Sequence, residues 1–264
     1  MTRKHVWRII AAALALALLV GVTAGCGGKT TTWKQVKKSG VLRVGIEGTY
    51  PPFNFVNNQK QYDGFDVDIA KEVGKRLGVK VEFVGVEWKG IIAGLLADKY
   101  DIVIAQMSIT EERKKSVDFT EPYVMTGAVL ITRKGDDRFK QLSDIKGAKV
   151  GVGTGTNFET LAKTVQGADV KGYAAFNDYL QDLLNKRLDV IINDQLLAGD
   201  AIKKGSLPIQ VTSGLLEQDR IGMAIKKDNP DFLQKVNEVL AAMKTDGTYD
   251  TIYMKWFGMK PPAW

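Results

Sequence analysis

Apolar residues in this chain alternate between two spacings, and this alternation restricts the possible folds more than any other feature. Val41 to Ile46 is a short apolar run typical of a buried strand. Phe65 to Leu77 repeats its apolar residues at helical spacing and ends at Gly78. Further segments of both kinds follow, with strands predicted over 79–84 and 101–105 and a short helix over 90–97. Such alternation predicts an α/β fold with mostly parallel strands.

The same order of segments begins again near residue 148. Strands are predicted over 148–153, 170–173, 189–192 and 209–212, and helices over 157–165, 179–186 and 196–203. The β-rich segments Gly127 to Thr132 and Gly222 to Ile225 are predicted to cross between the two runs, and a last helix over 230–242, continuing to Trp256, returns to the first. We therefore predict two lobes, residues 33–127 with 226–264 and residues 128–225, joined by two hinge strands around a cleft.

The first 25 residues have the composition of a secretory signal peptide. Basic residues precede a 15-residue apolar run from Ile9 to Thr23, which is short for a transmembrane helix. Small residues then lead to Cys26, and residues 26–32 are predicted to form a polar tether. Thr23 to Cys26 resembles a lipobox, in which Cys26 carries the lipid anchor; the alternative is cleavage near Ala24 that leaves a free thiol.

Composition excludes several classes of active site. His5 and Cys26 are the only histidine and cysteine, so removal of the signal leaves no histidine. Nucleophiles that depend on histidine, a histidine general base and a Cys/His zinc site are then excluded. Asp66 and Asp68 are predicted to cap the helix over 65–77, favoured by its dipole, and no metal or cofactor is expected.

The net charge gives little support for a nucleic-acid partner. The whole chain carries +7, from 37 basic and 30 acidic residues. Without Arg3, Lys4 and Arg8 of the signal, 34 basic residues remain against 30 acidic ones, a charge of +4. That is the charge of an ordinary solvated surface.

Polar and aromatic residues follow the predicted strands, where parallel α/β sheets bind their ligands. In the first lobe they are Glu47, Tyr50, Trp88, Gln106, Met107, Ser108 and Arg113, and in the second Gly153, Thr156, Asn157 and Asp194. We take these residues as the candidate ligand-binding site.

Six segments that contain or flank these positions resemble the polar amino-acid-binding proteins of ABC importers, solute-binding protein family 3. They are residues 48–53 (GTYPPF), 64–68 (GFDVD), 108–113 (SITEER), 119–123 (FTEPY), 150–157 (VGVGTGTN) and 246–249 (DGTY). The resemblance covers Trp33 to Trp264. It implies a two-lobed periplasmic-binding-protein-like fold of type II and export to the outer side of the cytoplasmic membrane. It further implies an ABC permease as partner and a monomeric binding protein rather than an enzyme.

The chemistry of the site suits a free amino acid. Arg113 can hold the ligand carboxylate through two parallel charge-assisted hydrogen bonds, helped by the backbone N–H groups of Thr156 and Asn157. Asp194 can take the ammonium group from the opposite lobe, and Tyr50 and Trp88 can enclose the side chain. A single zwitterion would thereby connect the two lobes and favour the closed form.

Several of these residues also have simpler structural explanations. Arg113 could belong to a solvated helix of ion pairs, Asp194 could cap the next helix, residues 154–157 could form only a tight turn and cap, Tyr50 could be core packing and Trp88 a surface aromatic.

The identity of the amino acid stays open. The motifs look most like those of cystine-binding members, although those members usually carry Asn at the position of Ala105. Glu47 could instead pair with the cationic side chain of Arg or Lys, and a Gln side chain could satisfy Glu47 and Gln106. Two other functions remain as alternatives: a dehydratase-type enzyme on the same fold, with Glu47 or Asp194 as acid or base, and the sensor module of a receptor.

Overall fold

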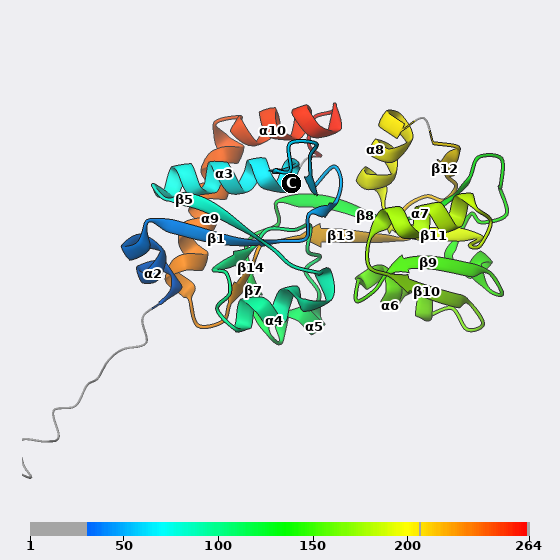
Figure 1. Cartoon of the computed structure of the whole chain (residues 1–264), viewed down its shortest axis with the longest axis horizontal. Coiled ribbons are helices and arrows are strands. Elements are labelled where there is room, and N and C mark those ends of the chain that lie inside the picture. Colours follow the sequence, from blue (N-terminus) through cyan, green and yellow to red (C-terminus); the bar gives the residue numbers. More distant parts are fainter. Residues whose placement is uncertain (1–30, 206, 263–264) are drawn as a thin grey trace, which may run out of the picture. The chain divides into compact units, whose positions relative to one another are not determined.

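The computed structural model describes residues 31–205 and 207–262, apart from the side chains of 204 and 205. The predicted signal peptide, Cys26 and most of the tether lie outside the described residues. The fold is a two-lobed α/β architecture, which confirms the predicted fold class (Figure 1). Thr31 and Thr32, assigned to the tether, instead form the N-cap and first residue of a helix.

The first lobe is built on a sheet with strand order β5-β1-β6-β14-β7. Its strands are β1 (Val41–Ile46), β5 (Lys80–Gly85), β6 (Ile102–Val103), β7 (Val117–Phe119) and β14 (Ala224–Lys226). Strand β1 runs parallel to β5 and β6, whereas β14 is antiparallel to β6 and β7. The sheet is therefore mixed rather than mostly parallel, because β14 belongs to the chain segment that returns from the second lobe.

Alternate residues around β6 face opposite sides of this sheet. Ile102 and Ile104 join a cluster that includes the helix over 65–77, while Val103 and Ala105 pack with Ile91 from the other side. This two-residue period explains why the segment is apolar throughout, since both of its faces are covered by helices.

Helices cover both sides of the first sheet, with α3 and α10 above it and α4 below it in Figure 1. The elements outside the sheet are α2 (Thr32–Ser39), α3 (Phe65–Leu77), η1 (Trp88–Gly90), α4 (Ile91–Leu96), α5 (Glu111–Lys114), α9 (Pro230–Thr245) and α10 (Thr248–Phe257). The predicted last helix is two helices, because the chain turns at Gly247, whose φ is +80°. A small antiparallel sheet of β2 (Thr49–Tyr50), β3 (Asn54–Val56) and β4 (Tyr62–Asp63) was not predicted.

The second lobe has a sheet with strand order β10-β9-β11-β8-β12, to which β13 adds along β8. Its elements are β8 (Val124–Arg133), η2 (Leu142–Ile145), β9 (Lys149–Gly153), α6 (Asn157–Lys163), β10 (Asp169–Tyr173), α7 (Phe176–Leu184), β11 (Val190–Asp194), α8 (Gln195–Gly205), β12 (Ile209–Val211) and β13 (Glu217–Ile221). Strand β9 is parallel to β10 and β11, and β8 is antiparallel to its neighbours. Helix α7 and helix α6 pack against opposite faces of β11.

Two strands, the long β8 and the shorter β13, connect the lobes in Figure 1. They pair antiparallel, from Val124 opposite Ile221 to Ala128 opposite Glu217. The first crossing was predicted over 127–132 and lies inside β8. The second prediction, over 222–225, was wrong in position: the crossing strand ends at Ile221, and residues 224–226 already belong to the first sheet.

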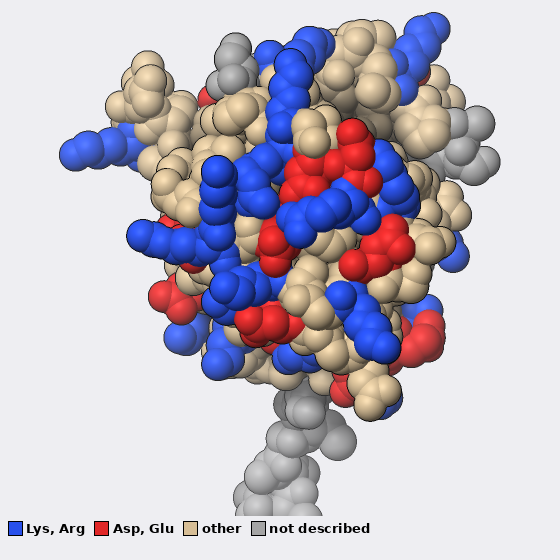
Figure 2. Space-filling model, turned by 90° about the vertical axis from the view of Figure 1, so that its right-hand side faces the viewer, with Lys and Arg blue, Asp and Glu red and all other residues tan. Residues whose placement is uncertain are grey.

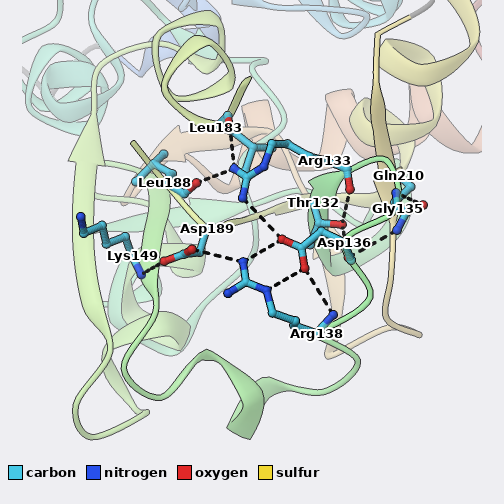
Figure 3. A network of polar contacts seen from close by, with 10 residues as sticks. All are labelled: Thr132, Arg133, Gly135, Asp136, Arg138, Lys149, Leu183, Leu188, Asp189 and Gln210. Carbon is cyan, nitrogen blue, oxygen red and sulfur yellow. Dashed lines mark hydrogen bonds and ion pairs between the residues drawn. The ribbon is translucent and has the colours of Figure 1, made fainter. Parts of the chain in front are cut away.

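Ion pairs hold together one end of the second lobe (Figure 3). Asp136 accepts hydrogen bonds from Nε and an Nη of Arg138, both at 2.8 Å, and Arg138 also contacts Asp189 at 3.2 Å. The other oxygen of Asp189 accepts the N–H of Lys149. Arg133 donates to the carbonyls of Leu183 and Leu188. These contacts connect the turn after β8 to the start of β9 and β11 and to the end of α7.

Basic and acidic side chains are interspersed on the face of the second lobe drawn in Figure 2. This mixture agrees with the ordinary solvated surface that the charge predicted. Within residues 31–205 and 207–262, no helix has both the length and the apolar composition needed to span a membrane.

Candidate functional site

A cavity lies where the strands of both sheets end, between the two lobes. It encloses about 570 Å³ of space, a figure that includes its open mouth. Nine of the predicted site residues line it: Glu47, Tyr50, Trp88, Gln106, Ser108, Gly153, Thr156, Asn157 and Asp194. Residues that are far apart in the sequence therefore lie together in this cavity, as we predicted from their positions after the strands.

Arg113 lies at the edge of this cavity, on the short helix α5. Thr110 caps that helix by accepting the N–H of Arg113, and Glu111 and Glu112 pair with Lys114 and Lys115. The Arg113 guanidinium instead turns toward the cleft, where it donates to the carbonyls of Ser108 at 2.8 Å and Gly155 at 3.4 Å.

The charge of Arg113 lacks a direct carboxylate partner in the described part of the chain. Burial lowers the pKa of this guanidinium to about 10, a shift that the charge of Asp219 opposes. At neutral pH and below it is therefore a desolvated cation. Such a group gains most from an anion that accepts two hydrogen bonds, and a carboxylate is the simplest one.

Trp88 connects the lobes and covers Arg113. Its ring lies 5.1 Å from the guanidinium carbon, and its Nε1–H donates to the Gly155 carbonyl at 3.2 Å. Arg113 and Trp88 of the first lobe thus share one backbone acceptor of the second lobe, and Trp88 is more than a surface aromatic.

Asp194 caps a helix and also lines the cavity. Its Oδ1 accepts the N–H groups of Leu196 and Leu197 and so caps α8. Its Oδ2 accepts from the Thr126 hydroxyl at 2.8 Å and from Nε2 of Gln106 at 3.4 Å. The residue lines the cavity but is almost inaccessible, and burial raises its pKa to about 6. At neutral pH it presents a buried anion to a ligand.

Glu47 is a second carboxylate in the cavity wall. It accepts a 2.6 Å hydrogen bond from Thr49 and forms no ion pair with any described residue. Burial raises its pKa. A cationic group of the ligand would satisfy this carboxylate.

Gln106 extends from the first lobe toward Asp194 and has an unusual backbone. Its φ is +51°, a conformation that non-glycine residues adopt rarely. Its Oε1 is buried and has no hydrogen-bond partner among the described residues, although its Nε2 is engaged. An unpaired buried acceptor in a cavity wall suits an N–H donor of a ligand.

Asp219 is a site residue that the sequence analysis missed. Both of its oxygens accept from Nδ2 of Asn157, at 2.9 and 3.1 Å, and Oδ1 of Asn157 accepts from Ser108 of the first lobe. Burial raises the pKa of Asp219. Asp219 lies within the hinge strand β13, where a search of strand ends could not find it.

The other second-lobe residues form a turn. The N–H of Thr156, proposed to bind the ligand, donates to the Gly153 carbonyl at 3.3 Å, and its hydroxyl caps α6 by accepting from Glu159. Turn and cap are thus present, and Thr156 and Gly153 still line the cavity.

Met107 lies elsewhere than predicted. Its side chain is fully buried in a cluster with Ile91 and Leu95, and its carbonyl accepts from Gly222. The alternation along the chain explains this position, since Met107 points to the opposite side from its cavity-lining neighbours Gln106 and Ser108.

Aromatic residues of the second lobe complete the cavity. Sequence analysis placed none of them in the site; they are Phe158, Tyr173, Phe176 and Tyr179. Asn193 links two aromatics across the cleft, accepting from Tyr50 at 2.5 Å and donating to Tyr179 at 2.6 Å. Tyr50 also stacks on Phe53, so it combines core packing with a place in the wall.

No cluster of potential metal ligands occurs among residues 31–205 and 207–262. The site instead combines one desolvated cation, several buried carboxylates and an aromatic wall across two lobes. Such a fold and cavity define a two-lobed solute-binding protein.

Comparison with known proteins specifies the family. Residues 42–259 match the model of the bacterial extracellular solute-binding proteins, family 3, and the chain belongs to that family. A similar curated protein is the L-cystine-binding protein TcyJ of Escherichia coli (strain K12), which is 39% identical over 93% of each chain.

Two solved structures extend the comparison. An ancestral arginine-binding protein, solved with arginine and with glutamine bound, is 43% identical, has a TM-score of 0.79 and matches 83% of this chain and 99% of its own. The ancestral amino acid-binding protein AncCDT-1, described as a precursor of cyclohexadienyl dehydratase, is 39% identical, has a TM-score of 0.82 and matches 86% of this chain and all of its own.

Proposed function

We propose that this protein captures a polar L-amino acid between its lobes and delivers it to an ABC permease. The observation that carries the proposal is that Asp194 of the second lobe lines the cavity while Arg113 of the first lobe lies at its edge, against the carbonyls of Ser108 and Gly155. A free amino acid joins a carboxylate and an ammonium at fixed separation, so it would complement both residues at once and tie the lobes together.

L-cystine is the first candidate ligand. The similarity to the cystine-binding protein of Escherichia coli covers nearly the whole chain and supports this choice. Cystine has a second ammonium group, which can pair with Glu47, and a disulfide that can lie against the aromatic wall. Its second carboxylate would need donors from neutral groups such as the hydroxyl of Tyr179, which lines the cavity.

A basic amino acid is the second candidate, and Glu47 favours it. A partly desolvated carboxylate without a cationic partner is costly, and the side chain of Arg or Lys would neutralise it. The ancestral relatives solved with arginine and with glutamine support keeping both of these ligands in the test.

Binding without chemistry is the simplest use of these carboxylates. Asp194 is occupied by a helix cap and a hydroxyl, and Glu47 by Thr49, and both have binding roles that need no proton transfer. The dehydratase-type alternative rests on the relation of AncCDT-1 to a dehydratase. Recovery of each candidate ligand unchanged after incubation would argue against it.

We further propose that the protein acts as a monomer, exported by its signal peptide and held at the membrane through lipid on Cys26. Labelling of cells with a radioactive fatty acid tests the anchor. Incorporation that is lost in Cys26→Ser would support lipidation, and a processed but unlabelled wild type would exclude it.

Thermal unfolding of residues 29–264 against the twenty amino acids, cystine and ornithine tests the ligand. The protein is first unfolded and refolded to remove any bound ligand. A ligand at a hundred times its Kd stabilises by about 2.7 kcal/mol, which raises Tm by a few degrees. A shift with cystine alone supports the first candidate, and a shift with Arg and Lys supports the second. If no amino acid changes Tm, the proposed function is wrong.

A further inference from the structure

Asp66 is a buried carboxylate that the binding chemistry does not use. The sequence predicted it to cap α3, but its side chain has no contact with solvent and does not cap the helix. It accepts hydrogen bonds from the hydroxyl of Tyr123 at 2.7 Å and from Nδ2 of Asn54 at 2.8 Å. Both donors are themselves fully buried.

Each of these donors is also hydrogen-bonded to a backbone N–H at a strand end beside the cavity. Oδ1 of Asn54 accepts the N–H of Gly48 at 2.9 Å, next to Glu47. The hydroxyl of Tyr123 accepts the N–H of Gln106 at 3.2 Å. Asp66 is therefore linked to the loop after β1 through Asn54, and to the loop after β6 through Tyr123 and through an interaction of its carboxylate with the N–H of Gln106.

The two backbone positions at the ends of this chain share a left-handed conformation. Gly48 has φ +80° and Gln106 has φ +51°. For Gln106 this conformation is strained, because its Cβ crowds the following carbonyl. A hydrogen bond that fixes its N–H therefore helps to keep the side chain of Gln106 directed toward Asp194.

The direction of the hydrogen bonds determines what the central residue must be. Both ends are backbone N–H groups, which can only donate inward. Asn54 and Tyr123 each accept on the outer side and therefore donate on the inner side. The central group must accept twice and donate nothing, and an ionised carboxylate meets this condition. Asparagine at position 66 would turn an NH2 group toward one of the two donors.

We propose that Asp66 is a positioning residue, which holds the loops carrying Glu47 and Gln106 in their ligand-binding conformation through Asn54 and Tyr123. This inference extends the proposed amino-acid-binding function to a residue that never touches the ligand. We define the Asp66 relay as Gly48, Asn54, Asp66, Tyr123 and Gln106.

The relay makes a specific prediction about exchanging its residues. Asp66→Asn puts an NH2 group against one of the two donors, Asn54 or Tyr123, and Asn54→Asp puts two carboxylates face to face. The double variant Asp66→Asn/Asn54→Asp restores every bond: Asp at 54 accepts from Gly48 and from Asn at 66, which accepts from Tyr123. Val73→Ala, a truncation in the core face of the same helix, is the control for destabilisation alone.

Calorimetric titration with L-cystine, L-arginine and L-glutamine, together with Tm, measures the effect. Each single variant should bind the ligand of the wild type at least about tenfold more weakly. The double variant should bind it within about threefold of the wild-type affinity. Val73→Ala should bind like the wild type despite its lower Tm. Singles that bind normally, or a folded double variant as weak as the singles, would overturn the proposal.

Amide hydrogen exchange of the ligand-free protein gives a second test that does not depend on any ligand. The N–H groups of Gly48 and Gln106 should be protected in the wild type, and Tyr123→Phe should reduce the protection of Gln106 while that of Gly48 remains unchanged. Rapid exchange of both in the wild type would overturn the relay even if binding is normal. Absence of binding to all three probes with both amides protected would count against the proposed function and leave the relay standing.

Discussion

Asp194 shows how one carboxylate can serve the backbone and the cavity together. One oxygen caps α8 and the other accepts from Thr126 and Gln106. Because the cap fixes the side chain, the anion is already oriented before a ligand arrives, which lowers the entropy cost of binding. Arg113 is held similarly by the carbonyls of Ser108 and Gly155.

Replacement of Arg113 should therefore reduce the affinity for the ligand by more than the loss of one charge would. We expect Arg113→Ala to weaken binding at least about a hundredfold, since it removes one partner of a desolvated charge pair. Arg113→Lys should recover only a small part, because an ammonium cannot make two parallel hydrogen bonds to a carboxylate. Titration calorimetry with the ligand found by the thermal screen measures this loss. Arg138→Ala, at the far end of the second lobe, should bind normally; equal losses in both variants would contradict a direct role.

Acid should weaken binding through Asp194. Burial raises the pKa of this carboxyl to about 6, and a ligand ammonium favours its ionised form. Ligand binding therefore releases a proton near that pH, and affinity is full above it and falls as the pH drops below it. Kd measured across this range, with proton release from calorimetry in two buffers, checks the prediction.

Two variants separate Asp194 from the other carboxyl in the wall. Burial also raises the pKa of Glu47, so Glu47→Gln should keep the acid-induced loss of affinity while Asp194→Asn removes it. An unchanged pH profile in Asp194→Asn would assign the effect to another group.

At the scale of elements, the ion pairs of Figure 3 stabilise the second lobe away from the cavity. Arg138 lowers the pKa of Asp136, and burial of Asp189 is outweighed by the N–H of Lys149 and by Arg138, so its pKa is lowered too. A carboxyl whose pKa is lowered in the folded protein stabilises the fold when the pH is above its ordinary pKa. This stabilisation is lost as the pH falls through the lowered pKa.

Arg138→Ala should destabilise the protein by about 1 kcal/mol at neutral pH, a small value because the guanidinium is 58% exposed. The difference from the wild type should shrink below the ordinary carboxyl pKa of about 4 and in high salt. Urea unfolding of both proteins at neutral pH and below about pH 4 measures this difference in stability. Lys140→Ala, which breaks an exposed pair with Asp137, should have little effect; an equal loss there would remove any special role for the Arg138 contacts.

Elements with a strong local signal could be predicted from the sequence. The bounds of β1 and α3 agree with the prediction because apolar spacing and a terminal glycine determine them locally. The second hinge strand was misplaced because β13 alternates exposed and buried residues and its pairing with β8 is nonlocal.

Prediction of the site residues from the sequence was incomplete because of nonlocal packing as well. Strand ends marked nine of the eighteen residues that line the cavity, but Asp219 and the aromatic wall follow from tertiary packing that no local pattern reveals.

At the scale of the whole molecule, hydrogen bonds cross the cleft from five side chains among the described residues of the first lobe. Tyr50, Trp88, Gln106, Ser108 and Arg113 each form a hydrogen bond across the cleft. The lobes can therefore close on contacts of their own, and a ligand adds to a form that is already stabilised.

Trp88→Phe should shift this balance without removing the aromatic cover of Arg113. It deletes only the Nε1–H bond to Gly155, so we expect a loss of affinity of about three- to tenfold. The ligand-free protein should also have a larger radius of gyration by small-angle X-ray scattering. Trp33→Phe, which stacks on Phe232 outside the cleft, is the matched control. A free radius of gyration equal to that of the wild type would argue that this bond does not favour closure.

The shared acceptor at Gly155 has a consequence for how such a protein can evolve. Both Trp88 and Arg113 close onto a main-chain oxygen, which no side-chain substitution in the second lobe can delete. Other residues that line the cavity, such as Glu47 and Gln106, do not contact that oxygen. Changes of ligand preference can therefore accumulate at those positions while the ability to close is inherited intact.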